Sequence, residues 1–368
     1  MSISQRFQPL DIFRGLTIAF MIIVNTPGDW GNTYSLLLHA DWHGFTPTDL
    51  VFPSFLFAVG NAMAFVSIKW EQQSTQKVLL RGAKRAALIF LLGYFLYWFP
   101  FFRSVDGAWA FKSFSSTRIF GVLQRIGFCY ALALPLIYYL EKRQLLWVSS
   151  FLLLAYWLMM SIFGDLTLEG NAAIKLDLWA LGPSHMYGGE GIPFDPEGLL
   201  SSLPAVVNIV GGYLVGLYIR EQRFGYEQLA KLLLAGIALM IVSYLWHPLF
   251  PVNKKIWTSS YVLLTVGLDM VILGIIIYLM ELRSGKWKFS VLNTFGINPL
   301  FIYLLSGLLA KGMMLIKING NSLYGLVYQH GFAWIGGNLG SLAFALFITL
   351  ICYLVARWLE KKEIYIKI

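Results

Sequence analysis

Three polar residues at the borders of the first long hydrophilic segment have side chains suited to acyl or proton transfer. Asn25 ends an apolar run, His39 lies within the polar segment, and Asp49 opens the next apolar run. An imidazole can act as a general base near neutral pH, and an amide can orient it or hold a developing oxyanion. We therefore take His39, Asn25 and Asp49 as candidate catalytic residues. The simpler alternative is an interfacial histidine that satisfies backbone groups, with Thr48 or Asp49 as a helix N-cap.

The same segment also raises the question of a metal. His39, Asp41 and His43 have side chains of the types that bind zinc. Their alternating spacing suits a strand, whereas the segment has the composition of a loop, and no fourth ligand lies nearby. The two cysteines, Cys129 and Cys352, fall inside apolar runs and are expected to be packed free thiols. We expect no metal site.

A second polar segment, 253–259, precedes a long apolar run and carries two adjacent lysines. A helix start of this kind attracts anions, although lipid headgroups and helix capping would also explain it. The segment supplies most of the candidate substrate-binding residues, namely Asn253, Lys254, Lys255, Trp257 and Ser259.

The longest hydrophilic segment, 164–198, adds His185 to the candidate substrate-binding residues. It ends in Asp195-Pro-Glu197-Gly198, a pattern typical of a helix start with proline in the first turn. We interpret Asp195 and Glu197 as capping residues.

Charged residues inside apolar runs form a further group of candidates. Asp11 and Arg14, Arg125, and Asp269 lie within such runs, where charge is costly and usually faces a polar cavity or an ion-pair partner. Structural salt bridges are one interpretation. The other is a cavity whose cations hold the phosphates of a cofactor, with Arg14, Lys84, Arg85 and Arg125 as the cofactor-binding residues. If phosphates bind from the outer side, Lys254, Lys255 and Arg118 take that role instead.

The elements that carry these residues are apolar. The chain has 368 residues, 58% hydrophobic and 13% charged, with a mean hydropathy of +0.66. A soluble domain carries about 25% charged residues, so lipid is the expected solvent. The net charge of +9 does not indicate nucleic acid, because the basic residues lie in short loops rather than in a basic stripe.

The runs long enough to span a bilayer predict an all-α transmembrane bundle of about ten helices, in one domain over 1–368. The first run lacks a cleavage site and is expected to be a retained helix. We find no inverted repeat and no pair of broken helices. The predicted spans are 10–27, 49–68, 84–102, 118–140, 145–163, 199–219, 229–246, 257–281, 290–311 and 336–358.

The basic residues predict the orientation of the bundle. With both termini in the cytoplasm, about 18 basic residues lie in inner loops and about 8 in outer ones, as expected from the positive-inside rule. Chemistry on the outer side is then expected in the polar segments 25–49, 164–198 and 246–259.

Several of these segments together resemble the heparan-alpha-glucosaminide N-acetyltransferase family, which has a lysosomal member and bacterial relatives. The resemblance covers nearly the whole chain in the same order. The matching pieces are Leu10-Asp-Ile-Phe-Arg14-Gly15, Val24-Asn25, His39-Ala-Asp-Trp42, Thr48-Asp49-Leu-Val-Phe-Pro53, Gly121-Val-Leu-Gln124-Arg125, Asp195-Pro-Glu-Gly198, Asn253-Lys254-Lys255-Ile-Trp257-Thr258-Ser259 and Gly296-Ile-Asn298-Pro-Leu-Phe-Ile-Tyr303.

The resemblance implies an enzyme that takes acetyl from cytoplasmic acetyl-CoA and delivers it to the amine of a glucosamine-type sugar across the membrane. It implies His39 as the catalytic histidine, Asn25 as an active-site residue, a homodimer, and a bacterial inner (plasma) membrane location. The acceptor, an amino sugar or a glycan end, stays open. The alternative function is a membrane transporter of amino sugars or their oligomers, which intramembrane charges would suit equally.

Overall fold

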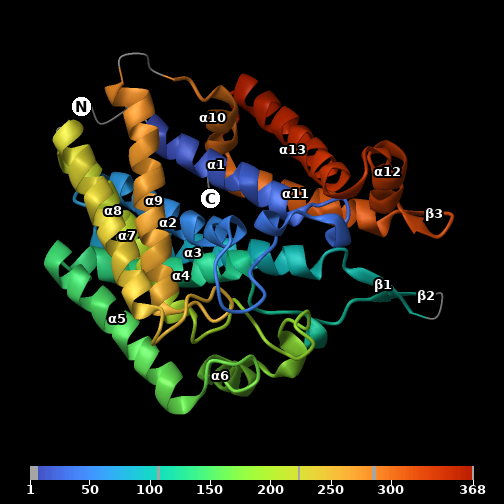
Figure 1. The fold of residues 1–368 in the computed structure, drawn as a ribbon, viewed down its shortest axis with the longest axis horizontal. Coiled ribbons are helices and arrows are strands. Elements are labelled where there is room, and N and C mark those ends of the chain that lie inside the picture. The colour runs from blue at the N-terminus through green and yellow to red at the C-terminus, as the bar shows by residue number, and fades with distance from the viewer. Residues whose placement is uncertain (1–6, 106–107, 223, 284–286, 367–368) are drawn as a thin grey trace.

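A computed structural model describes residues 7–105, 108–222, 224–283 and 287–366 of the chain. In this part the chain is mostly helical (Figure 1). The α-helices are α1 (Gln8–Asn25), α2 (Pro47–Val66), α3 (Thr75–Trp98), α4 (Val122–Tyr139), α5 (Lys142–Phe163), α6 (Ala172–Leu181), α7 (Ser202–Glu221), α8 (Tyr226–Trp246), α9 (Ser259–Ile277), α10 (Ser290–Ile297), α11 (Pro299–Leu315), α12 (Leu323–Gly331) and α13 (Gly337–Lys361). The predicted all-α bundle is confirmed.

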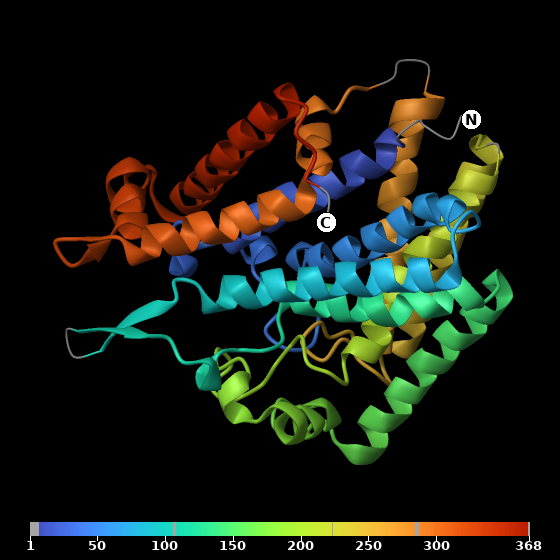
Figure 2. The ribbon, with the colours of Figure 1, turned by 180° about the vertical axis from the view of Figure 1, so that it is seen from behind.

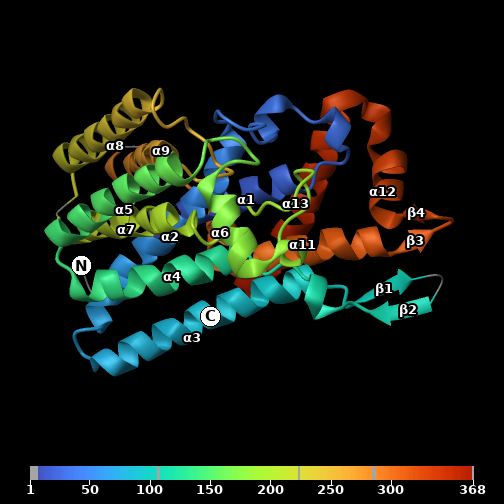
Figure 3. The same ribbon diagram turned by 90° about the horizontal axis from the view of Figure 1, so that it is seen from below.

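Two short antiparallel hairpins interrupt the helices. One pairs β1 (Phe102–Val105) with β2 (Ala108–Phe111), and the other pairs β3 (Lys317–Ile318) with β4 (Asn321–Ser322). Both hairpins lie at the same end of the molecule, next to α12 (Figure 3). We call this the outer end, following the predicted orientation.

Seven helices in the described part of the chain are long and apolar enough to cross a membrane. They are α2, α4, α5, α7, α8, α9 and α13, and the pair α10 and α11 counts as an eighth if it forms one span. The remaining predicted spans correspond to α1 and α3, which both carry charged residues in their first half. The structure thus supports a polytopic bundle, and the total of ten spans stays a prediction.

The predicted span 290–311 is a broken helix, which corrects our expectation that no such break exists. α10 and α11 meet at Asn298 and differ in direction by 87°. The cause is local, because proline excludes the helical conformation from the residue before it, and Asn298 has a ψ of 54° ahead of Pro299. The Asn-Pro pair is the feature of the sequence from which this break could have been predicted.

Exposure separates the helices that form the core from those that face lipid. α2 and α7 are mostly buried and pack on each other, whereas α5 and α8 are mostly exposed. The exposed side chains on α5 are large and apolar, among them Trp147, Phe151 and Leu158. In water such a surface would associate, but hydrocarbon chains solvate it.

The loops sort to two ends of the bundle. The loops from α2 to α3 and from α4 to α5 lie on the right in Figure 2, whereas the β1–β2 hairpin, α6 and α12 lie on the left and below. These groups match the inner and outer segments predicted from the basic residues. The sidedness itself, with the N-terminus in the cytoplasm, stays a prediction.

The contact between α2 and α7 predicts a site that is sensitive to a single methyl group. A Cβ at Gly60 would lie 1.8 Å from the backbone oxygen of Ile209. We expect Gly60→Ala to lower the free energy of unfolding by about 1–3 kcal/mol through overpacking, measured as the melting temperature in detergent. Gly312→Ala is the control, since nothing lies within 4 Å of that position, and it should leave the melting temperature unchanged or higher. Equal melting temperatures for the two variants would contradict the close packing of α2 on α7.

Candidate active site

A cavity of about 250 Å³ opens between α1, α2, α3, α4 and α11 near the outer end. We call it the outer cavity. Its walls contain both apolar and polar residues. The polar lining residues are Asn25, Thr26, His39, Thr48, Tyr97, Glu197, Lys254, Tyr303, Ser306 and Lys311.

His39 faces this cavity and is held by Asp49. The imidazole Nδ1 lies 2.7 Å from Asp49 Oδ1, while 42% of the His39 side chain stays exposed. An ionised carboxylate only accepts hydrogen bonds, so Nδ1 carries the proton and Nε2 keeps its lone pair. The arrangement orients a general base toward the cavity.

Asp49 also lies in the first turn of α2. Its Oδ2 accepts hydrogen bonds from the backbone N–H of Thr46 at 2.9 Å and of Ala40 at 3.2 Å. Together with Thr46 as N-cap, it forms a capping box. The prediction of Thr48 or Asp49 as N-cap is therefore wrong by two or three residues, although Asp49 does take part in capping, and the same carboxylate holds His39.

Lys254 lies close to both nitrogens of the imidazole. Its Nζ is 3.1 Å from His39 Nε2 and lines the same cavity. The pKa of His39 lies below its usual value of 6.5, because burial disfavours the imidazolium and the charge of Lys254 adds to this, while Asp49 acts in the opposite direction. Burial also lowers the pKa of Lys254. His39 is therefore neutral at physiological pH.

Asn25 reaches the cavity from the last turn of α1. Its Nδ2 donates a hydrogen bond to Met21 O at 2.8 Å, which fixes the amide and leaves its second N–H and its oxygen for a ligand. Tyr97 from α3 and Tyr303 from α11 bring phenol groups to the same cavity. These groups suit a ligand with many hydroxyls.

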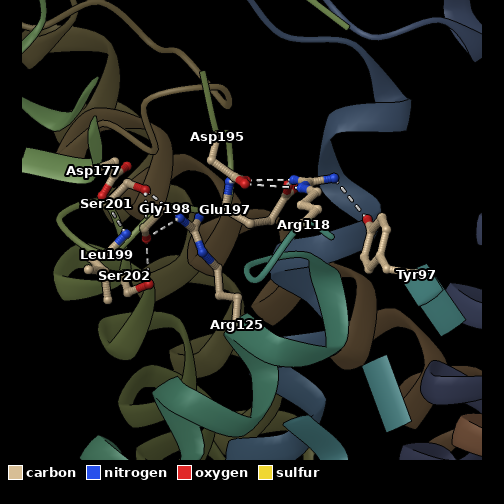
Figure 4. Close-up of polar contacts among 10 residues, drawn as sticks. All are labelled: Tyr97, Arg118, Arg125, Asp177, Asp195, Glu197, Gly198, Leu199, Ser201 and Ser202. Carbon is tan, nitrogen blue, oxygen red and sulfur yellow. Dashed lines mark hydrogen bonds and ion pairs between the residues drawn. The ribbon is translucent and has the colours of Figure 1, made fainter. Parts of the chain in front are cut away.

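Glu197 and Arg118 form an ion-pair group beside the cavity (Figure 4). Arg118 donates to both oxygens of Asp195, at 2.6 and 3.0 Å, and to Glu197 Oε2 at 2.5 Å. Its guanidinium also lies over the rings of Tyr97 and Tyr187, at 5.0 and 4.8 Å. Burial alone would raise the pKa of Glu197, but the charges of Arg118, Lys254 and Arg125 together outweigh it and hold that pKa below its usual range. Glu197 is thus an ionised carboxylate on the wall of the cavity.

A smaller cavity of about 90 Å³ lies between the same five helices, closer to the inner end. We call it the inner cavity. Arg14 and Arg85 line it together with apolar residues. Along α2, Phe52 lines the outer cavity and Phe55 the inner one. Three residues of helix rise about 4.5 Å, so about one helical turn of side chains separates the two cavities.

The four predicted cofactor-binding residues do not form one group. Arg14 and Arg85 come together at the inner cavity, and Lys84, next to Arg85, is exposed outside it. Arg125 is fully buried near the outer end, where it donates to Gly198 O at 3.0 Å and to Ser201. Arg125 lies apart from Arg14 and Arg85 because it belongs to the first turn of α4, which begins at the outer end.

Most of the predicted substrate-binding residues lie away from the outer cavity. Lys254 lines it, whereas Lys255 pairs with Glu190 at 2.6 Å. Trp257 and Ser259 are fully buried, and Ser259 Oγ donates to Leu153 O at 2.7 Å. These two polar groups are therefore satisfied within the protein.

Asn253 and His185 act as links between loops. The amide nitrogen of Asn253 lies 3.2 Å from His43 Nδ1. The Nδ1 atom of His185 lies 2.8 Å from Thr117 O, which joins the loop after α6 to the segment before α4. Among the described residues, no three His, Cys, Asp or Glu side chains gather as a possible metal site.

Sequence reasoning missed the role of three lining residues. Glu197 was interpreted only as a cap, and Tyr97 and Tyr303 were not singled out. Glu197 does lie in the turn that precedes α7, with its N–H 3.1 Å from Asp195 Oδ1. The pattern Asp-Pro-Glu-Gly gave the turn but not the cavity beside it.

Known proteins match this chain along the segments that build the two cavities. A sequence model described as "Heparan-alpha-glucosaminide N-acetyltransferase, catalytic" matches residues 6–180, a stretch that includes Asn25, His39 and Asp49. The chain is 26% identical over 361 residues to the Mus musculus protein named heparan-alpha-glucosaminide N-acetyltransferase, covering 82% of this chain and 53% of that protein. For the Homo sapiens protein of the same name the identity is 25% over 356 residues, covering 81% and 52%.

This chain is thus similar in sequence to the heparan-alpha-glucosaminide N-acetyltransferases. The predicted family resemblance is confirmed. The chain spans about half the length of the curated relatives it matches. The stretch that the family model matches includes α1 to α5, hence four of the five helices around both cavities.

The geometry around His39 predicts an unusually acidic imidazolium. We expect a pKa below 6.5 for His39, and we expect Lys254→Met to raise it, because a positive charge 3.1 Å from Nε2 is removed. The titration can be followed by NMR of labelled histidines, of which the chain has five, with the His39 signal assigned by its loss in His39→Gln. A pKa at or above 6.5 in the wild type, or a lower one in Lys254→Met, would contradict this geometry.

Proposed function

We propose that the chain is a transmembrane acetyltransferase that moves an acetyl group from cytoplasmic acetyl-CoA to the amine of a glucosamine-type sugar on the outer side. The observation that carries the proposal is the orientation of His39 by Asp49 on the wall of a polar cavity between membrane-spanning helices. The kinship with N-acetyltransferases supports the same reaction class. Asn25, His39 and Asp49 are the proposed catalytic group.

The two cavities suggest how the donor reaches His39. In this proposal the phosphates of acetyl-CoA bind at the inner end near Arg14 and Arg85, and the thin pantetheine arm extends between the five helices toward the outer cavity. Residues 11 to 25 of α1 span about 21 Å at 1.5 Å per residue, a distance that an extended arm must largely cover. The side chains of Phe52 and Phe55 would have to turn aside to admit it.

In the proposed reaction the amine nitrogen attacks the thioester carbonyl while His39 Nε2 removes a proton from that nitrogen. Asn25 donates to the carbonyl oxygen as negative charge develops there. The carbon–sulfur bond then breaks, and the imidazolium returns its proton to the departing thiolate of CoA. Holding two substrates from opposite faces at one point contributes much of the rate. A covalent acetyl-histidine is the alternative route, and labelled acetyl trapped on the protein without acceptor would identify it.

We further propose that the chain works as a homodimer in a bacterial inner membrane, with an amino sugar or a glycan end as acceptor. The alternative function, a transporter of amino sugars or their oligomers, gains one supporting observation in the broken pair α10 and α11, since broken helices are common in transporters. Purified protein incubated with radiolabelled acetyl-CoA and glucosamine distinguishes the two. An enzyme forms N-acetylglucosamine, whereas a transporter gives solute flux in vesicles and no product.

In that assay we expect His39→Ala to lower the rate of transfer by about a hundred- to ten-thousand-fold, the usual contribution of a placed general base. Asp49→Asn should also lower the rate, because an amide at this position favours the wrong imidazole tautomer. His330→Ala is the matched control, since His330 is exposed on α12, and it should retain full activity. Full activity in His39→Ala would remove this residue from either route.

The inner cavity generates a separate prediction about the donor. Arg85→Gln should raise the KM for acetyl-CoA by about ten- to a hundred-fold, since a hydrogen bond to a charged group contributes about 1.5–3 kcal/mol. Lys84→Gln removes a neighbouring charge that lies outside the cavity and should change this KM little. Steady-state kinetics at saturating glucosamine measures both, and a larger effect from Lys84→Gln would place the donor elsewhere.

A further inference from the structure

We infer that Glu197 is the carboxylate that binds the protonated amine of the acceptor and so selects amino sugars over neutral sugars. This inference deepens the proposed function and rests on it for the identity of the acceptor. It assigns a binding role to a residue that the sequence pattern marks only as part of a helix start.

The first argument is that Glu197 is an ionised carboxylate on the cavity wall. Arg118 meets Asp195 through two hydrogen bonds, from Nε to Oδ2 at 3.0 Å and from Nη2 to Oδ1 at 2.6 Å, and it donates a further one to Glu197 Oε2. The positive charges of Arg118, Lys254 and Arg125 hold the pKa of Glu197 below its usual range against the effect of burial. An ionised carboxylate that lines a cavity can form a charged hydrogen bond with a cationic ligand.

The second argument is that one oxygen of Glu197 stays available. Its Oε2 accepts from Arg118 at 2.5 Å, and among the described residues none hydrogen bonds to Oε1. Lys254, which shares the cavity with Glu197, makes no ion pair with it in this part of the chain. The field of Glu197 nevertheless acts on Lys254 and on His39, and it raises the pKa of both against the effect of their burial. The free oxygen therefore belongs to a carboxylate close to the proposed base.

The third argument is rigidity. The turn that carries Glu197 is fixed from two sides, since Arg125 donates to Gly198 O at 3.0 Å and Asp177 Oδ1 accepts from Leu199 N at 2.8 Å (Figure 4). No side chain fits at Gly198, where a Cβ would lie 1.7 Å from Asp177 Oδ2. A buried carboxylate in such a rigid turn is already positioned for a ligand and needs no rearrangement when the ligand binds.

The chemistry follows from the protonation state of an amino sugar. Its amine is largely an ammonium near neutral pH, which Glu197 can bind through a charged hydrogen bond. The neutral His39 first accepts one ammonium proton and releases it to solvent, to which its side chain is partly exposed. The free amine then attacks the thioester while His39 takes the second proton from its nitrogen, and the imidazolium returns that proton to the departing thiolate of CoA. A neutral sugar with a hydroxyl in place of the amine cannot form this charged hydrogen bond and binds more weakly.

Binding and transfer can be measured on the same purified full-length protein. We expect the wild type to bind glucosamine more tightly than glucose without acetyl-CoA, and Glu197→Gln to lose that preference while it binds glucose as before. In the acetyl-CoA assay, Glu197→Gln should raise the KM for glucosamine by about ten- to a hundred-fold with a smaller change in kcat. Glu190→Gln is the matched control, since this carboxylate in the same loop pairs with Lys255 away from the outer cavity.

The outcomes separate this inference from the proposed function. A Glu197→Gln protein that keeps the preference for glucosamine over glucose overturns the role of Glu197, whatever the wild type catalyses. A wild type that prefers glucosamine but forms no N-acetylglucosamine overturns the acetyltransferase function and leaves the ammonium site standing. Should Glu197→Gln fail to fold, Glu197→Asp keeps the charge and shortens the side chain. It should retain the preference for glucosamine with a raised KM, and an unchanged KM would contradict the inference.

Discussion

The hydrogen bond between His39 and Asp49 connects the chemistry of the outer cavity to the folding of the bundle. One oxygen of Asp49 holds the imidazole at 2.7 Å, and the other accepts from the backbone N–H groups of Thr46, the N-cap of α2, and of Ala40. The position of the proposed base is thus set by the start of a mostly buried helix. His39 lies in a loop, yet its side chain is positioned as precisely as one on a helix or a strand.

Hydropathy predicted the helices well because lipid imposes one rule on every segment. All backbone groups must be satisfied internally, so each long apolar run becomes a helix. The break at Asn298 escaped this rule because α10 and α11 together are as long and apolar as one span. Pro299 causes the break through its effect on the backbone of Asn298, and a hydropathy profile does not report such an effect.

The candidate site was harder to predict because it depends on contacts between distant segments. His39, Asn25 and Asp49 could be selected from residue type and position. In the structure His39 and Asn25 line one cavity, and Asp49 contacts His39. Arg125 was grouped with Arg14 by charge alone, although its place in α4 puts it at the opposite end. Glu197 had a complete local explanation as part of a turn. The role that we propose for it depends on its place on the wall of the outer cavity, which residue type and spacing alone do not reveal.

The bend between α10 and α11 also links the last described residues to the interior. Asn298 Nδ2 donates to Ile364 O at 2.9 Å, and its Oδ1 accepts from Ile366 N at 2.9 Å. The next two residues, Pro299 and Leu300, line the inner cavity. The segment after α13 therefore supports the backbone beside the inner cavity. We expect an affinity tag fused close to Ile366 to strain this backbone and so to change the shape of the inner cavity.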